Sequence, residues 1–139
     1  MIDFDNDIQI LKILKKTKNI LCFTFTYNDN VYFGKLFTNL LYNEYFREKN
    51  INLYLNKNNN DFTNFAKLLY YYDNIKINNN INKLFHKDIE TFHFIVFEYY
   101  NSRPLRFYIN KLSKKNFNEV LLQIKNSTNI LNNLNIIHY

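Results

Sequence analysis

One lysine is a candidate for chemistry because of the segment in which it lies. Lys35 is in the middle of residues 31–37, an apolar stretch in which Val31, Phe33, Lys35 and Phe37 would share one face of a strand. An unpaired ammonium group is costly to bury. The charge of Lys35 therefore either serves a function or, on an edge strand, reaches water at the end of its flexible side chain. The strand alone favours the second interpretation.

The remaining reactive side chains indicate structural roles. The single cysteine, Cys22, excludes an internal disulfide and fits a reducing compartment. Because Cys22 lies in an apolar strand, we expect a buried structural thiol rather than a nucleophile. His86 and His93 have no metal-ligand spacing with a cysteine or another histidine, which argues against a zinc site. His138 follows two isoleucines, and a lone histidine in such a position is more often packed than catalytic.

Composition indicates a folded intracellular protein. The 139 residues are 47% hydrophobic and 19% aromatic, which is enough for a real core. No stretch reaches the length of an apolar membrane span, and the acidic N-terminus does not resemble a signal peptide, so we expect a cytoplasmic protein without membrane association. The net charge of +6 permits nucleic-acid binding. The lysines are scattered and there is no arginine-rich run, so a solvated basic surface is the better interpretation.

The first part of the chain predicts three antiparallel strands and a helix. Strands are expected at residues 8–14, where a short helix would also fit, at residues 21–27, which alternate as a half-buried strand does, and at residues 31–37. A polar connection at residues 15–19 and the turn Asn28-Asp29-Asn30 join them. Residues 39–55 predict a helix, because apolar side chains and Glu48 recur at spacings of three and four.

Two further strands and two helices are expected in the rest of the chain. After a polar loop at residues 56–64, residues 65–72 predict a strand, and residues 73–90 predict a polar connection that contains a short apolar element at 81–85. Residues 91–97 predict another strand, whose apolar run indicates burial on both faces. After a turn cluster at 101–104, residues 105–112 and 113–134 predict a short and a long helix. Asn116 would be the N-cap of the long helix, with Glu119 as its capping-box partner.

The order of these elements and the final residues of the chain resemble the protein kinase family. Kinases have a strand, a hinge, a short helix and a long helix, followed by a sequence of the form -(I/L)-(I/V)-H-R-D-. Ile136-Ile137-His138-Tyr139 matches that sequence up to the histidine. The resemblance implies an α+β fold, with a small lobe and hinge at residues 1–100, made of a five-stranded antiparallel sheet and one helix. The first helices of the large lobe would follow at residues 101–139.

The resemblance also implies a site for ATP with magnesium. Lys35 corresponds to the lysine that holds the α- and β-phosphates. The helix glutamate that pairs with this lysine would be Glu48 or, one turn earlier, Glu44. Glu48 fits best, because Ile51 and Leu55 follow it on the face that packs toward the sheet. A solvated helix glutamate is the alternative for both.

The hinge and the end of the chain complete the implied assignments. Phe97 corresponds to the gatekeeper, and Glu98, Tyr99 and Tyr100 correspond to the hinge, whose backbone groups contact adenine. Because a backbone contact does not depend on the side chain, the residue types at these positions give little evidence for or against adenine binding. His138 corresponds to a histidine that is structural in the family.

Several family features have no counterpart in the sequence. The only glycine, Gly34, lies outside residues 15–19, which take the place of the glycine-rich loop that covers the phosphates. Phe33 stands where a small alanine usually faces adenine, and Tyr139 stands where an arginine is usual. The catalytic aspartate, the magnesium-binding asparagine and the Asp-Phe-Gly segment are absent. We therefore expect a truncated or split serine/threonine protein kinase-like protein that is inactive as this chain alone.

Two other functions remain open from the sequence. The chain could be a non-catalytic, pseudokinase-like module that binds a protein partner, or a basic nucleic-acid-binding protein unrelated to kinases. For the kinase-like interpretation, the expected partners are a protein substrate or a complementing kinase chain. Self-association is also expected, because the lobe-facing side of the long helix would be exposed.

Overall fold

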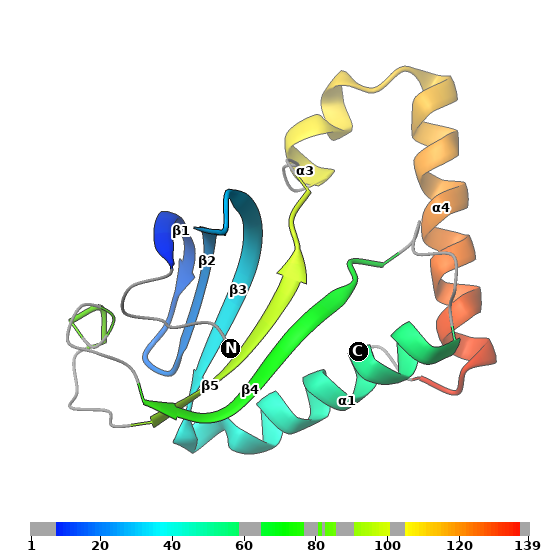
Figure 1. Ribbon diagram of the computed structural model, residues 1–139. Helices are drawn as coiled ribbons and strands as arrows, with labels where there is room; N and C mark the ends of the chain where they lie inside the picture. Colours follow the sequence, from blue (N-terminus) through cyan, green and yellow to red (C-terminus); the bar gives the residue numbers. More distant parts are fainter. Residues whose placement is uncertain are drawn as a thin grey trace.

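The computed structural model describes residues 8–58, 65–76, 81, 83–85, 91–100 and 105–136, and shows an α+β fold (Figure 1). The sheet is made of β1 Gln9–Lys16, β2 Ile20–Tyr27, β3 Asn30–Thr38, β4 Leu68–Lys76 and β5 Thr91–Glu98. The helical elements are η1 Asn39–Leu41, α1 Tyr42–Asn58, α3 Leu105–Tyr108, η2 Ile109–Lys111 and α4 Lys114–Asn133. All strand pairs are antiparallel and the order is β1-β2-β3-β5-β4, so the predicted five-stranded antiparallel sheet is confirmed.

The first three strands form the predicted meander. β1 is a strand rather than a helix, and it ends at Lys16, two residues beyond the predicted end. Asn28 and Asp29 make the β2–β3 turn with φ of 47° and 63°, a left-handed conformation that asparagine and aspartate tolerate well. This turn fixes a register in which Cys22 lies opposite Lys35 and Phe23 lies opposite Gly34.

β2 is covered on both faces, which corrects the prediction that residues 21–27 are half-buried. Residues 21–25 of β2 are all buried. One face carries a cluster of aromatic and aliphatic side chains that includes Phe23, Phe25 and Phe94, and Ile81 and Phe85 pack onto it from the β4–β5 connection. The other face packs on α1. Because β5 is buried on both faces as predicted, it is the central element of the core.

β4 lies three to four residues later than the predicted strand at 65–72. Its start is set by Lys67, whose N–H and C=O are both bonded to Glu98. Its end was misplaced because Asp73 and Asn74 are turn-forming residue types. The strand accommodates them with an irregular register between Tyr72 and Ile75, and with Asn74 at a φ of 51°.

The helices follow the predicted order with different boundaries. α1 continues to Asn58, and α3 with η2 confirms the short helix. The N-cap of α4 is Ser113, not Asn116, because the Ser113 hydroxyl accepts a hydrogen bond from the Asn116 N–H at 3.1 Å. Of the described helices, none is long and apolar enough to cross a membrane. His138 and the turn cluster at 101–104 lie outside the described residues.

Candidate functional site

Lys35 and Glu48 form an ion pair between the sheet and the helix. Lys35 Nζ lies 2.7 Å from Glu48 Oε2, and the two side chains are 23% and 31% exposed. The Lys35 ammonium also lies 5.0 Å from the centroid of the Phe37 ring. β3 lies inside the sheet, so the interpretation of Lys35 as an edge-strand lysine is wrong. Glu44 is exposed in the first turn of α1, and the structure brings Glu48 to Lys35.

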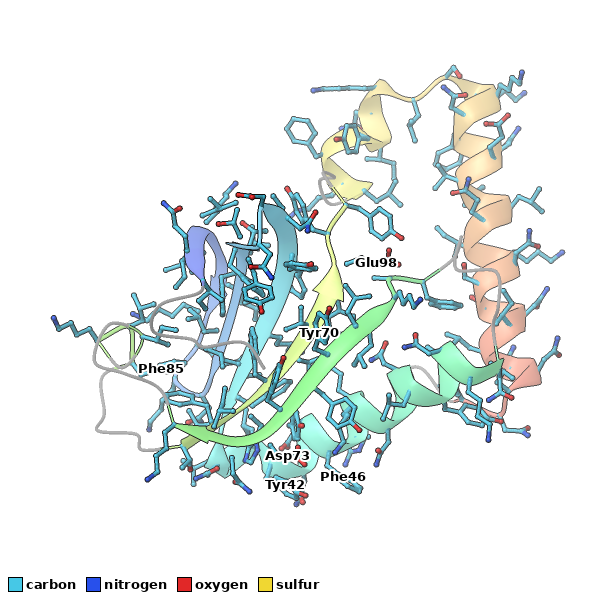
Figure 2. The ribbon with its side chains drawn as sticks, viewed as in Figure 1. Tyr42, Phe46, Tyr70, Asp73, Phe85 and Glu98 are labelled. Atoms are coloured by element: carbon cyan, nitrogen blue, oxygen red, sulfur yellow. The ribbon has the colours of Figure 1, made fainter. Side chains whose placement is uncertain are left out.

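A second group of polar contacts holds α1 against β4 and β5. Tyr45 of α1 is fully buried and donates its hydroxyl to the Asp73 carboxylate of β4. Its ring stacks on His93 of β5, with centroids 4.8 Å apart. Lys49 Nζ lies 3.6 Å from Asp73 Oδ1, and Figure 2 shows Asp73 beside α1. Because Tyr45 and Lys49 flank Glu48 on the same helix, these contacts fix the position from which Glu48 reaches Lys35.

Lys49 is buried among aromatic rings. Its ammonium lies 5.0–5.3 Å from the ring centroids of Tyr45, Phe46 and Tyr71. Cation–π contacts of this kind compensate part of the cost of burying a charge. This group was not predicted from the sequence, because Asp73 was assigned to a polar connection rather than to β4. An available signal was the spacing of Tyr45 and Lys49, which are four residues apart and therefore share a helix face.

The surroundings of His93 favour the neutral form of its imidazole ring. It is 1% exposed, and its Nδ1 accepts a hydrogen bond from the Asn74 N–H at 3.2 Å. Burial lowers the pKa of His93, the Asp73 carboxylate acts in the opposite direction, and the Lys49 ammonium lowers it further. The folded state therefore binds fewer protons than the unfolded state just below the ordinary histidine pKa of 6.5.

We expect the protein to lose stability as the pH falls below about 6.5, because the unfolded state then takes up a proton that folded His93 resists. Asparagine at this position keeps an acceptor near Nδ1 and does not titrate. His93→Asn should therefore lower stability at neutral pH, but its stability should fall less steeply between about pH 6.5 and pH 5. Urea unfolding of both proteins across this range measures the effect. Parallel pH curves would show that His93 is not the responsible group.

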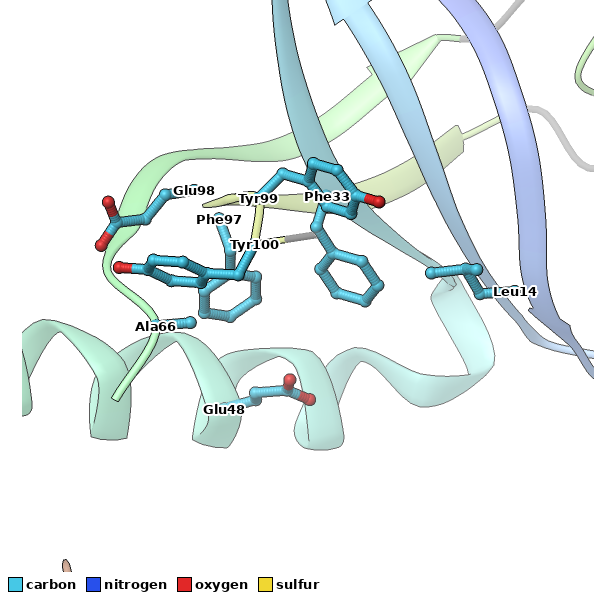
Figure 3. A pocket seen from close by; sticks show the side chains of 8 residues that line it. All are labelled: Leu14, Phe33, Glu48, Ala66, Phe97, Glu98, Tyr99 and Tyr100. Carbon is cyan, nitrogen blue, oxygen red and sulfur yellow. The ribbon is translucent and has the colours of Figure 1, made fainter. Parts of the chain in front are cut away.

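A pocket of about 380 Å³ lies between the end of β1, β3, the end of β5 and α1 (Figure 3). Its volume is within the range of small-molecule sites. The structure brings five of the sequence-predicted residues to it, and Lys35 adjoins it through Glu48. The lining residues are Leu14, Phe33, Glu48, Ala66, Phe97, Glu98, Tyr99 and Tyr100.

Aromatic rings form much of the wall of this pocket. The rings of Phe33 and Phe97 are 6.0 Å apart and tilted by 46°. Phe33, which stands where the family resemblance implies a small alanine, is one of the residues that line the pocket. A hydrogen bond to the Glu98 carboxylate raises the pKa of the Tyr100 hydroxyl, and the Tyr100 ring lies beside the pocket (Figure 3).

Glu98 also connects the pocket to β4. Its carboxylate accepts a hydrogen bond from the Lys67 N–H at 3.0 Å, and its own N–H donates to the Lys67 carbonyl at the same distance. The sequence analysis did not find Leu14 or Ala66 as lining residues. Leu14 was placed at the very end of a strand, and Ala66 was placed inside one, so neither position pointed to a pocket.

Two further observations bear on what the site can hold. Among the residues that the structure describes, no group of three or more histidine, cysteine, aspartate or glutamate side chains is arranged to hold a metal ion. Comparison of the sequence with protein-family models and with curated proteins gives no match. A functional assignment therefore depends on the geometry of the pocket and the ion pair.

Proposed function

We propose that the pocket binds ATP or a similar purine nucleotide, and that the chain is a protein kinase-like small lobe followed by the first helices of a large lobe. The observation that carries this proposal is the ion pair between Lys35 and Glu48. It joins an internal strand to the helix beside it, at the margin of an apolar pocket. The implied activity is serine/threonine protein phosphorylation, whose catalytic groups are not among the described residues.

The residues of the pocket fit a purine base. Leu14, Phe33 and Phe97 offer apolar surface to a flat ring, and Tyr100 adds an aromatic face at the exit of β5. The backbone of residues 98–100 would supply polar contacts to the base. The Glu98 N–H is bonded to Lys67, so it is the other backbone groups of this segment that would contact the base.

The ion pair fits the phosphate end of the nucleotide. A lysine ammonium has three N–H donors, so Lys35 can donate to Glu48 and to a phosphate oxygen together. Glu48 would orient Lys35 toward the pocket and limit its motion. Among the described residues no cluster of three or more histidine, cysteine, aspartate or glutamate side chains is arranged to hold a metal ion, and we assign magnesium no role there.

Filling the pocket should abolish binding. Ala66 is exposed and lines the pocket, so tryptophan at this position would occupy the space of the base while leaving the core unchanged. We expect Ala66→Trp to weaken adenosine and ATP binding at least about tenfold, because a purine base cannot share a pocket of this size with an indole ring. Ala66→Ser is the matched control and should bind as the wild type does. Calorimetric titration measures both ligands.

Two results of this titration would contradict the proposal. One is the absence of saturable binding of adenosine and ATP to the wild-type protein. The other is full affinity in Ala66→Trp, which would place the nucleotide elsewhere. Thermal unfolding of each variant by circular dichroism separates a blocked pocket from a damaged fold.

A non-catalytic module that binds a protein partner is the second candidate, and one observation favours it. A groove of about 570 Å³ lies between α1 and α4, and α4 has no buried residue along its length. Apolar side chains line the groove, including Ile51 and Leu55 of α1 and Val120, Ile124 and Leu131 of α4. A complementing kinase chain or a second copy could bind there. In this function the wild-type protein would bind neither adenosine nor ATP.

A further inference from the structure

Lys15 and Lys35 lie in one row across three strands. In the sheet register Lys15 is opposite Cys22, and Cys22 is opposite Lys35. Residues directly opposite in antiparallel strands project from the same face. Both lysines therefore project on the face that packs toward α1, with Cys22 between them. Their Cα atoms are separated by two strand spacings, or about 10 Å.

An irregularity in β1 places the pocket and this row next to each other. The β1–β2 register shifts between Ile13 and Lys15, so Leu14 is an extra residue at this point. An extra residue interrupts the alternation of side chains along a strand. Leu14 can therefore line the pocket while its neighbour Lys15 lies opposite Cys22 on the same face. If the base of a nucleotide contacts Leu14, the part of the nucleotide that follows the base would lie beside Lys15.

The electrostatics of Cys22 agree with this arrangement. Burial raises the pKa of its thiol, the Lys35 ammonium lowers it, the Glu48 carboxylate raises it, and the Lys15 ammonium lowers it. The charges of Lys15, Lys35 and Glu48 thus all act at one point of the sheet. Glu48 pairs with Lys35, so the charge of Lys15 is the one that this carboxylate does not offset in an ion pair, and it would be available for an anion.

Three amides of the β1–β2 turn, those of Thr17, Asn19 and Ile20, already donate hydrogen bonds within the turn. The Thr17 N–H donates to the Ile20 carbonyl at 2.8 Å. The Thr17 hydroxyl oxygen accepts from the N–H groups of Asn19 and Ile20 at 3.4 and 3.0 Å. A phosphate could not use these amides without breaking the turn. Binding of an anion at this end of the pocket would therefore depend on lysine side chains.

We infer that Lys15 and Lys35 form a phosphate-binding site made of side-chain ammonium groups, which binds the phosphate chain of the nucleotide without a divalent metal. This inference rests on the proposed function for the identity of the ligand, but the row of lysines exists independently of the base pocket. Each ammonium would donate charge-assisted hydrogen bonds to phosphate oxygens. Lys35 would use the donors that remain beside its bond to Glu48.

Lys15→Gln tests the site, and Lys16→Gln is its matched control. Lys16 lies opposite Leu21, so it projects from the other face of the sheet while carrying the same charge. Both lysines are exposed, and both variants should fold. The probes are adenosine, ATP and inorganic tripolyphosphate, each titrated by calorimetry at low salt in EDTA and again with magnesium.

We expect Lys15→Gln to weaken ATP and tripolyphosphate binding about three- to tenfold, the range for loss of one partly exposed charged contact. Adenosine binding should not change, and Lys16→Gln should bind all three probes as the wild type does. ATP should bind at least as tightly in EDTA as with magnesium, because magnesium neutralises part of the phosphate charge that the lysines would contact. Added salt should weaken ATP binding but not adenosine binding, because ions screen exposed charges.

The outcomes separate this inference from the proposed function. Equal losses in Lys15→Gln and Lys16→Gln, or ATP binding that requires magnesium, would overturn the lysine site. Adenosine binding without tripolyphosphate binding would also overturn it, while leaving the base pocket in place. Tripolyphosphate binding that depends on Lys15, in a protein that does not bind adenosine, would support the lysine site and count against the nucleotide proposal.

Discussion

Truncation of Tyr45 to alanine should lower the free energy of unfolding by about 3–5 kcal/mol, the range for loss of a fully buried aromatic side chain. Tyr45 is 0% exposed. Its ring contacts Phe37 of β3, with centroids 5.7 Å apart, and stacks on His93 of β5. The substitution would therefore leave a cavity between α1 and two strands. Chemical denaturation with urea measures the loss.

Tyr45→Phe separates the contribution of the ring from that of the hydroxyl. It keeps the ring contacts and removes only the hydrogen bond to Asp73, so we expect a loss of about 1 kcal/mol. Burial, with the hydrogen bond to Asp73, raises the pKa of Tyr45, so the hydroxyl stays protonated and able to donate. Equal losses in Tyr45→Ala and Tyr45→Phe would show that the hydroxyl, and not ring packing, carries the effect.

The same substitution should also affect the candidate site. Glu48 follows Tyr45 by three residues on α1, so a loosened contact at Tyr45 leaves the position of Glu48 less defined. Tyr45→Ala should therefore weaken ATP binding more than adenosine binding, because the ion pair with Lys35 adjoins the phosphate end of the proposed ligand. A fall in stability with unchanged ATP affinity would show that the two sets of contacts are independent.

Local patterns in the sequence predicted the strands and the ion-pair partner well. Alternation of side chains located β2 and β3, and a continuous apolar run located β5, each to within one residue at each end. Helical spacing selected Glu48 over Glu44, and Glu48 is the glutamate that pairs with Lys35. The reason given for this choice was inexact, because Ile51 and Leu55 line the groove between α1 and α4, while Tyr45 packs against the sheet. These successes share a cause: each depends on residues close together in the chain. Within one strand or one helix, polar and apolar side chains recur with the period that the backbone geometry of that element imposes.

Contacts between distant residues could not be predicted in this way. Tyr45 and Asp73 are 28 residues apart, and their hydrogen bond requires both the position of α1 and the continuation of β4 past Tyr72. The short apolar element at 81–85 was predicted, but nothing local indicated that Ile81 and Phe85 pack against the face of the sheet that carries Phe23 and Phe25. The lysine row depends on an irregular β1 register, which no local pattern indicated.

Replacement of Gly34 by alanine should lower the free energy of unfolding by about 1–3 kcal/mol, the usual cost of overpacking a core. A Cβ at this position would lie 2.7 Å from Cε2 and 2.8 Å from Cζ of Phe94, and 3.0 Å from Cε1 of Phe25. No described glycine has a positive φ, so Gly34 is required for space and not for backbone conformation. Phe94 has little freedom to move, because it is fully buried and stacked on Phe23 at 5.8 Å.

Phe94→Leu provides the control, because a smaller side chain removes the atoms that the new Cβ would meet. The double variant should lose less stability than the sum of the two single losses, since each substitution relieves the defect of the other. If the losses of unfolding free energy in the two single variants add up in the double variant, the new Cβ at residue 34 does not press on Phe94. Gly34 lies between Phe33 and Lys35, so a shift of β3 that relieves the contact would displace both a pocket wall and the paired lysine. Gly34→Ala should therefore weaken nucleotide binding as well as stability, and Phe94→Leu should restore both in part.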